Sequence, residues 1–161
     1  MRLALRSDLP KLEWAGELAH FRNIFADAFR NSEEGTGLIW IVELTADGLI
    51  GQAIVSLFSK RRDLSDGANR AYLYGFRVRP EFRNRGVGTL LLRTIEADLI
   101  TRGYRILTLN VARENTAAQK LYERLGYRII SPEPGEWSYL DHEGQRREVH
   151  EPAWRMEKLL S

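Results

Sequence analysis

The feature that most constrains the fold is a segment in which a strand pattern changes into a helical pattern at two glycines. Residues 71–78 are rich in aromatic and β-favouring residues, and Pro80 ends that strand. From Gly86 onward apolar residues recur every four positions, which predicts one helix with a broad apolar stripe. Gly103 is expected to end this helix in a left-handed conformation. A helix entered directly from a strand in this way packs on the face of a sheet.

The remaining elements are predicted from periodicity and turn residues. We expect strands at 3–5, 38–44, 49–58, 105–111, 127–130 and 154–159. A hairpin is expected with arms at 137–140 and 146–150, after a turn at 131–135. Helical spacing runs from Leu12 to Phe29, with Asp8 as the N-cap, and we expect two helices broken near Gly16 or Asn23. Loops are expected at 31–37 and 60–69, and Asn115 and Gly126 bound a short helix.

This order of elements defines an α+β fold in a single domain over residues 1–161. The early hairpins predict an antiparallel first half of the sheet, and the later strand–helix–strand order predicts a mixed, twisted sheet. About four helices are expected, two on each face. A chain of 161 residues supplies enough apolar material for such a two-layer core.

Composition excludes several classes of function. Lys and Arg total 24 against 22 for Asp and Glu, so the net charge of +2 gives no reason to expect nucleic acid as a partner. The chain has no cysteine, which excludes disulfides, thiolate metal sites and cysteine nucleophiles. Its three histidines have no ligand spacing, so no metal is expected. No secretory signal or membrane-spanning stretch is present, so we expect a cytoplasmic protein without a membrane partner.

The turn from Arg83 to Gly88 carries the chemistry. Glycines let the backbone approach a ligand closely, and free N–H groups in the first helical turn favour negative charge. With Arg79, Arg83 and Arg85 nearby, the turn is expected to hold a pyrophosphate. A plain strand-to-helix connection explains two glycines equally well. The turn lacks the Gly-Lys-Ser/Thr of a P-loop and the third glycine of a dinucleotide-binding turn.

A second feature lies in the helix that follows Asn115. Tyr122 on the inner face of this helix could aim its phenol at a bound thioester. The simpler interpretation is that Tyr122 is a core aromatic residue and Asn115 only a helix cap.

Together, the two features resemble the GCN5-related N-acetyltransferase (GNAT) family. The family hallmark, Arg/Gln-x-x-Gly-x-Gly/Ala, has its counterpart in Arg83-Asn-Arg-Gly-Val-Gly88, and Asn-x-x-Ala-x-x-x-Tyr has its counterpart in Asn115-Thr-Ala-Ala-Gln-Lys-Leu-Tyr122. The strand end at 78–80 and the Leu-Gly-Tyr at 125–127 also match. The resemblance is densest from residue 74 to residue 130.

The resemblance implies acetyl-CoA as cosubstrate and assigns roles to particular residues. The strand before the turn is expected to splay from a parallel neighbour, so that its backbone at Phe76 and Val78 pairs with the pantetheine arm, which Asn115 also contacts. Tyr122 would protonate the departing thiolate as the catalytic acid. The pyrophosphate would lie on the main-chain amides of the turn and near the Thr89 hydroxyl; these turn residues are Arg83, Asn84, Arg85, Gly86, Val87 and Gly88.

The implied reaction moves an acetyl group from acetyl-CoA to a primary amine by direct attack in a ternary complex. Many family members carry a carboxylate base on the strand before the turn, whereas this chain has none at 72–76. Glu43, Tyr72, Tyr74 or a chain of waters remain as candidates for that role. The acceptor is a small-molecule or peptide amine that the sequence does not identify.

Other possibilities stay open at this stage. Without a carboxylate in the strand, the chain could be a non-catalytic acyl-CoA-binding module, and the scattered arginines leave nucleic-acid binding as a weaker alternative. Trp137, Tyr139 and Trp154 either line an acceptor pocket or only pack against the end of the sheet. A homodimer is compatible with the sequence.

Overall fold

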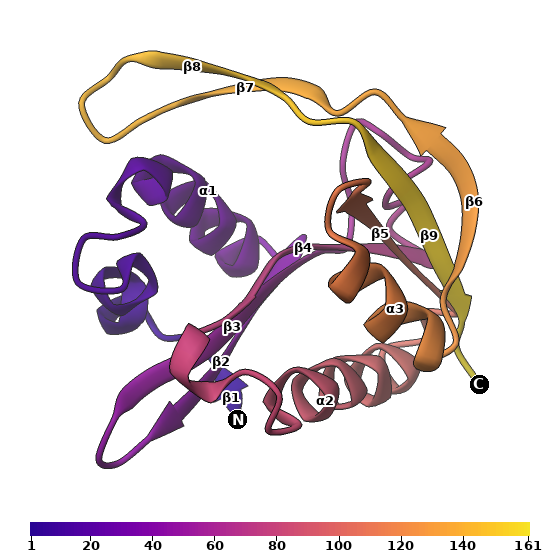
Figure 1. The fold of residues 1–161 in the computed structure, drawn as a ribbon, viewed down its shortest axis with the longest axis horizontal. Coiled ribbons are helices and arrows are strands. Elements are labelled where there is room, and N and C mark those ends of the chain that lie inside the picture. Colours follow the sequence, from indigo (N-terminus) through magenta and orange to yellow (C-terminus); the bar gives the residue numbers. More distant parts are fainter.

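A twisted sheet of seven strands organises the chain (Figure 1). The computed structural model describes all residues, 1–161. The strands lie in the order β1-β2-β3-β4-β5-β9-β6. Their bounds are Arg2–Leu3 (β1), Gly37–Leu44 (β2), Gly48–Ser56 (β3), Arg70–Val78 (β4), Ile106–Ala112 (β5), Arg128–Glu133 (β6) and Ala153–Leu159 (β9).

One pair of strands in this sheet is parallel. β4 runs parallel to β5, and every other neighbouring pair is antiparallel. The pairing of β4 with β5 covers only Arg70–Leu73 against Ile106–Leu109, although both strands continue further. This arrangement confirms the predicted mixed sheet with an antiparallel first half.

Helices cover both faces of the sheet and define two cores. The α-helices are Arg22–Glu33 (α1), Val87–Thr101 (α2) and Thr116–Arg124 (α3). The apolar stripe of α2 and residues of α3 join a cluster of 19 buried residues on one face. On the other face, α1 and the 3₁₀ segment Arg6–Glu13 join a cluster of 8. The alternating strand residues separate these clusters, as in β2, where Leu38 belongs to the first and Ile39 to the second.

The N-terminal helical segment differs from the prediction. It forms a 3₁₀ helix instead of an α-helix, and its N-cap is Leu5 instead of Asp8. Asp8 lies three residues in and is only 1% exposed; its carboxylate accepts hydrogen bonds from the Leu5 N–H and from Arg2 Nη1, both at 2.7 Å. The hydrogen bond from Arg2 is the main reason that the pKa of Asp8 lies far below its ordinary value. The predicted break falls after this segment, where Gly16 has a φ of +103°.

Several element boundaries also differ. The first strand is Arg2–Leu3 instead of 3–5, because Leu5 already caps the 3₁₀ segment. Helix α1 continues to Glu33 and shortens the loop predicted at 31–37. β6 runs through part of the turn predicted at 131–135, because Ser131, Pro132 and Glu133 pair with β9. The helix caps at Asn115 and Gly103 are confirmed.

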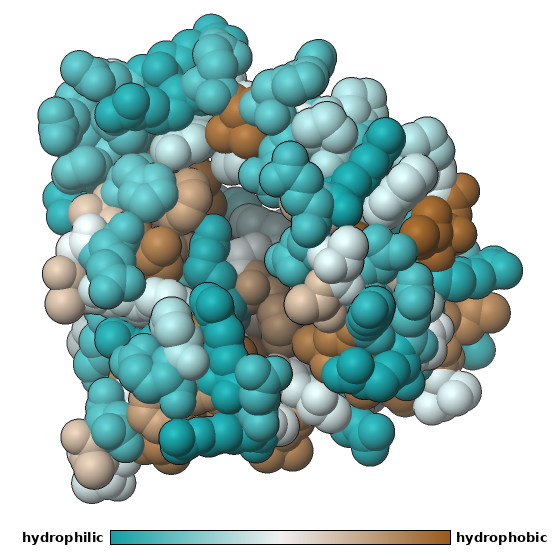
Figure 2. Space-filling model, in the orientation of Figure 1, coloured by the Kyte–Doolittle hydropathy of each residue, from teal (hydrophilic) through white to brown (hydrophobic).

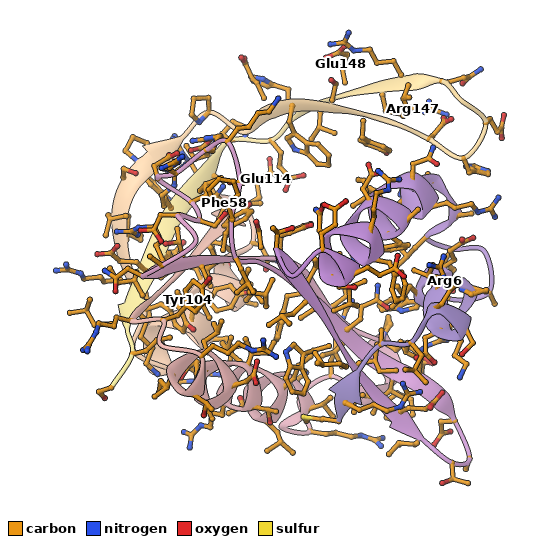
Figure 3. The ribbon with its side chains drawn as sticks, turned by 180° about the vertical axis from the view of Figure 1, so that it is seen from behind. Arg6, Phe58, Tyr104, Glu114, Arg147 and Glu148 are labelled. Atoms are coloured by element: carbon orange, nitrogen blue, oxygen red, sulfur yellow. The ribbon has the colours of Figure 1, made fainter.

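The strands β7 (Glu136–Leu140) and β8 (Arg146–His150) form a separate two-stranded sheet, which confirms the predicted late hairpin. The hairpin arches over the face that carries α1 (Figure 1). Asn23 of α1 donates hydrogen bonds to the carbonyl oxygens of Asp141 at 2.8 Å and Leu140 at 3.3 Å. Arg147 and Glu148 project to opposite sides of β8 (Figure 3). None of the helices has the length and apolar character needed to cross a lipid bilayer.

The buried Asp8 leads to a stability prediction. Asp8→Asn should lower the free energy of unfolding at pH 7 by about 2 kcal/mol, because Arg2 and the Leu5 N–H lose a buried anionic acceptor. The folded pKa lies below the unfolded value, so the contribution of Asp8 is complete above roughly pH 5 and is lost as the pH falls toward the folded pKa. In urea unfolding, the gap between wild type and variant should therefore narrow by about 1 kcal/mol from pH 7 to pH 3.

The exposed Glu148 supplies the control for this experiment. Glu148→Gln should leave the unfolding free energy unchanged at both pH values. A gap between wild type and Asp8→Asn that did not change with pH would contradict the assignment.

Candidate active site

A β-bulge at Gly75 sets the geometry of the candidate site. Tyr74 lies opposite Ile54 of β3, and Arg77 lies opposite Gln52, so one residue of β3 faces two residues of β4. Gly75 has a φ of +60°, a conformation that favours glycine. This bulge was not among the elements predicted from the sequence. The signal for it is a glycine in the interior of an otherwise aromatic strand.

The bulge changes which face each later side chain of β4 occupies. Tyr74 lies on the α1 face, with the smaller core. With simple alternation, residue 75 would be the next to face α2, but the bulge gives this place to Phe76. A Cβ added to Gly88 of α2 would lie only 3.4 Å from the Phe76 ring. Arg77 returns to the α1 face, where its guanidinium lies 4.7 Å from the centroid of the Phe21 ring. The extra residue therefore directs Arg77 to one side and Phe76 to the other.

Beyond Leu73, one backbone edge of β4 has no partner strand. Pairing with β5 ends at Leu73, while pairing with β3 continues to Val78. The Arg79 N–H donates to the carbonyl oxygen of Ile50 in β3 at 2.8 Å. Since backbone polar groups alternate along a strand, those of Phe76 and Val78 point to the opposite, unpaired side. The structure thus contains the splayed parallel pair that the resemblance implies.

The N-terminus of α2 lies next to this free edge and offers unpaired amides. Gly86 is the N-cap, with a φ of +81°, and no side chain caps the helix. The first backbone bond of the helix joins the Leu90 N–H to the Gly86 carbonyl oxygen at 3.0 Å. The N–H groups of Val87, Gly88 and Thr89 therefore have no acceptor within the helix, and they form the positive end of its dipole.

Two of the three arginines expected at this turn are found there. Arg83 donates from Nε to the carbonyl oxygen of Val78 at 2.9 Å, and the guanidinium of Arg85 lies 5.7 Å from the centre of the Phe82 ring. Arg79 was wrongly included. The bulge places its side chain on the α1 face, over the ring of Trp14 at 5.4 Å.

Asn115, just before α3, and Tyr122, within α3, lie at the opening between β4 and β5. The Asn115 side-chain oxygen accepts a hydrogen bond from the Ala118 N–H at 3.1 Å, which confirms it as the cap. The Tyr122 side chain is buried, and its ring centroid lies 6.3 Å from that of Phe76. Burial alone raises the pKa of Tyr122 to about 12. Tyr122 is thus both a core residue and a protonated phenol facing the pocket described next.

A pocket of about 980 Å³ lies between α1, the hairpin β7–β8 and the opened part of the sheet. Figure 2 shows a hollow with hydrophobic atoms at its base and hydrophilic residues around it. Its aromatic lining comes from Phe21, Phe25, Tyr72, Tyr74, Tyr122, Trp137 and Tyr139. Trp154 is not part of the lining and instead packs beneath Arg113, whose guanidinium lies 4.3 Å from its ring. Two of the three late aromatic residues therefore line the pocket.

The candidates for a general base are reduced by this geometry. Glu43 does not line the pocket; it is bound by Lys11 at 2.8 Å and by Arg2 at 3.1 Å on the opposite part of the sheet. Tyr72 and Tyr74 do line the pocket and stack with ring centroids 5.6 Å apart. Burial raises the pKa of Tyr74 to about 12 and also raises that of Tyr72, so both phenols are protonated at neutral pH. Neither is suited to accept a proton.

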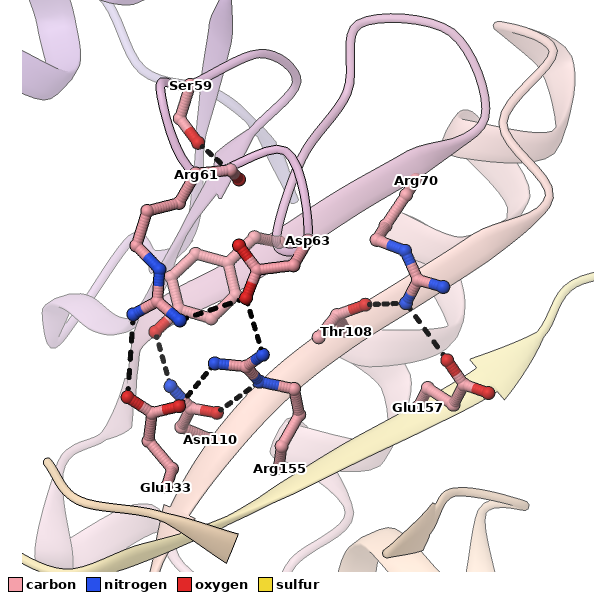
Figure 4. Close-up of polar contacts among 10 residues, drawn as sticks. Ser59, Arg61, Asp63, Arg70, Thr108, Asn110, Glu133, Arg155 and Glu157 are labelled. Carbon is pink, nitrogen blue, oxygen red and sulfur yellow. Dashed lines mark hydrogen bonds and ion pairs between the residues drawn. The ribbon is translucent and has the colours of Figure 1, made fainter. Parts of the chain in front are cut away.

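Two residues that line the pocket, Arg61 and Glu133, belong to a network of charged residues (Figure 4). Glu133 of β6 is bound by Arg155 of β9 and, at 3.4 Å, by Arg61. Asp63 accepts from Arg155 at 2.7 Å and from Arg61 at 2.9 Å. Sequence reasoning missed this network, because its members are far apart in the chain. Glu133 lines the pocket, but its carboxylate already accepts hydrogen bonds from two guanidinium groups. No cluster of three or more potential metal ligands is present in the structure.

The mixed sheet, the opened parallel pair and the free helix N-terminus together define an acetyltransferase fold. The family model described as "Acetyltransferase (GNAT) family" matches residues 5–127. The chain belongs to the GNAT acetyltransferase family.

Solved structures show the same fold at low sequence identity. The ribosomal-protein-S18-alanine N-acetyltransferase from Escherichia coli is 22% identical with a TM-score of 0.74, covering 99% of this chain and 92% of that chain. Arabidopsis thaliana NAA60 in complex with acetyl-CoA is 22% identical with a TM-score of 0.70, covering 99% and 97%. A spermidine N-acetyltransferase SpeG chimera from Vibrio cholerae and hSSAT is 20% identical with a TM-score of 0.70, covering 99% and 94%.

The bulge leads to a second stability prediction. Gly75→Ala should lower the free energy of unfolding by about 2 kcal/mol, because alanine is strained at this φ. Its Cβ would also lie 3.2 Å from the Ile54 side chain. The control is Gly48→Ala, at a φ of +73° with open space around the added Cβ, which should cost only about 1 kcal/mol. If urea unfolding gave the same loss of unfolding free energy for both variants, the close packing of Ile54 against Gly75 would make no contribution.

Proposed function

We propose that this protein transfers the acetyl group of acetyl-CoA to a primary amine by direct attack in a ternary complex. One observation carries the proposal. Tyr122 belongs to the core on the α2 face, yet it lines a pocket on the α1 face, because β4 and β5 separate after Leu73. A thioester lying in this opening would meet an amine from the pocket on one side and the phenol on the other.

The residues present fit the cosubstrate. In the proposed arrangement, the amides from Arg83 to Gly88 hold the pyrophosphate, and the Thr89 hydroxyl lies beside it. Support comes from the free N–H groups after Gly86 and from the open space in front of that glycine, where an added Cβ meets nothing within 4 Å. The backbone N–H and carbonyl of Phe76 have no partner strand and hydrogen-bond the pantetheine arm as an additional strand would. The backbone of Val78 lies beside the arm and keeps its N–H free, because only its carbonyl oxygen is taken, by Arg83. Asn115 contacts the arm from the start of α3.

Tyr122 acts as the general acid in this proposal. A phenol of raised pKa donates a proton only when the acceptor becomes strongly basic, and burial raises the pKa of a thiol in the same way. Proton donation by Tyr122 therefore accompanies the development of charge on the departing sulfur. The N–H of Val78 points into the same opening, where it stabilises the oxyanion of the tetrahedral intermediate.

The acceptor amine must reach the opening in its neutral form. An α-amine, with a pKa near 7.8, is neutral in roughly one molecule in seven at pH 7, whereas a lysine-type amine is neutral in about one in 2,500. A water chain in the pocket is the proposed route for the amine proton, because neither tyrosine nor Glu133 is suited to accept it. Two structural relatives are named for ribosomal-protein alanine and for spermidine, so both peptide and small-molecule amines belong in an acceptor screen.

Replacing the phenol tests the acid role. Tyr122→Phe should lower kcat by about 10²- to 10⁴-fold while the Kd for acetyl-CoA stays within about twofold of wild type. The variant should fold normally, because the Tyr122 hydroxyl makes no hydrogen bond within the protein that the substitution would remove. The control is Tyr127→Phe, which removes a 2.7 Å hydrogen bond to Glu96 from the same aromatic cluster but should keep its turnover. Equal turnover in Tyr122→Phe and wild type would exclude the acid role.

Replacing the capping glycine tests the pyrophosphate site. Gly86→Val should weaken coenzyme A binding, measured by calorimetry, by at least about 100-fold, because a branched side chain would fill the space in front of the amides. Gly103→Val at the other end of α2 is a matched control: both glycines have positive φ values and open surroundings. It should show a similar stability loss and unchanged binding. Retained coenzyme A binding in Gly86→Val would rule out the turn from Arg83 to Gly88 as the pyrophosphate site.

A non-catalytic acyl-CoA-binding module is the second candidate. The absence of a carboxylate from β4 is the observation that favours it. Such a module would bind coenzyme A but release no free thiol from acetyl-CoA with any amine. A thiol-release screen across amine classes therefore separates the two candidates.

A further inference from the structure

Arg77 is the charged side chain in the pocket that the reaction does not use. It lies directly after the bulge of β4, so its guanidinium reaches the α1 face. A Cβ on Gly75 would lie 3.6 Å from Arg77 Nη1, which places this nitrogen beside the point where β4 leaves β5. Arg77 therefore lines the same pocket as Tyr122 and lies beside the bulge.

The guanidinium of Arg77 lacks an anionic partner. None of the ion pairs or side-chain hydrogen bonds in the structure includes Arg77, and burial lowers its pKa. The unpaired nitrogens of the guanidinium keep some exposure to solvent, and the side chain lines the pocket. Its N–H donors are therefore accessible to a molecule in the pocket. Its guanidinium lies 4.7 Å from the centroid of the Phe21 ring, a cation–π contact that does not neutralise the charge.

The other charged groups around the pocket are paired or lie at its exposed rim. Asp27 pairs with Arg30 at 3.0 Å, Glu136 with His150 at 3.1 Å, and Glu133 with Arg155. Arg61 pairs with Asp63. Glu151 is exposed at the rim. A shielded, unpaired cation among groups that are already paired is costly for folding, and a bound anion would compensate it.

We infer that the acceptor is an amine that also carries a carboxylate, and that Arg77 binds this carboxylate. The inference rests on the proposed acetyl transfer and adds the substrate class. A planar guanidinium pairs with a carboxylate through two parallel hydrogen bonds. A single cation matches one negative charge, so a carboxylate compensates Arg77 without adding excess negative charge to the pocket.

The walls of the pocket define the body of this acceptor. Tyr72 and Tyr74 form a stacked pair on the floor, and Trp137 and Tyr139, 5.3 Å apart, lie on the roof. Flat aromatic surfaces on both sides favour an aromatic or extended apolar group between the amine and the carboxylate or beside them. An aromatic amino acid fits this description, and a polyamine does not.

Thiol release with matched pairs of amines tests the inference. Each pair shares one body and differs in the carboxylate: phenylalanine with phenethylamine, and 6-aminohexanoate with hexylamine. For at least one pair, wild type should show a kcat/KM about 10- to 100-fold higher for the carboxylated member. Arg77→Met should reduce this preference to within about twofold, and Arg77→Lys should restore part of it.

Arg79→Met is the matched control, because Arg79 lies two residues further along the same face but donates to the carbonyl oxygen of Leu49 instead of facing the pocket. It should keep the preference of wild type. A neutral member preferred in every pair, or a preference that survives Arg77→Met, would overturn the inference while leaving acetyl transfer intact.

A binding measurement covers the case in which none of the amines is acetylated. With coenzyme A present, 3-phenylpropionate should bind wild type about 10-fold more tightly than 3-phenylpropionamide, and Arg77→Met should abolish the difference. This result would support the anion site even if the proposed acetyl transfer failed. Equal binding of acid and amide to wild type would overturn it.

Discussion

The short pairing between β4 and β5 is the constraint on which the rest of the structure depends. Both strands extend beyond Leu73, but their hydrogen bonds stop there, and the bulge at Gly75 turns β4 away from its neighbour. The opening connects the two faces of a sheet that otherwise separates them. Without this opening, no single site would join the N-terminus of α2, the phenol of Tyr122 and the pocket under the hairpin.

Electrostatics at the two sides of this opening differ in kind. On the α2 face the positive potential comes mostly from backbone amides, whose direction is fixed by the helix and does not depend on protonation. On the α1 face, charged side chains are mostly compensated in pairs, and the network of Glu133, Arg155 and Asp63 joins β6, β9 and the loop after β3. The α2 side therefore presents a fixed backbone arrangement, whereas the α1 side is defined by side chains that differ in charge and shape.

Local patterns predicted most of the elements, including the start of α2 at Gly86. Gly103 and Asn115 have positions that follow from capping rules within a few residues, and the structure places both as expected. Errors arose where long-range contacts decide the outcome. Asp8 leaves the N-cap position because Arg2 and Lys11 surround it, and Arg79 changes faces because of a bulge upstream. The network around Glu133 joins residues too distant in sequence for any spacing rule to detect.

The hairpin β7–β8 has a consequence for how such a protein can change during evolution. It forms its own two-stranded sheet, and Asn23 joins its tip to α1 through carbonyl oxygens, which every residue type provides. Substitutions at the inward-facing positions of the hairpin therefore alter the roof of the pocket without disturbing the seven-stranded sheet. The lining of the pocket can therefore diverge by exchange of this one segment while the strand β4 and the N-terminus of α2 are inherited unchanged.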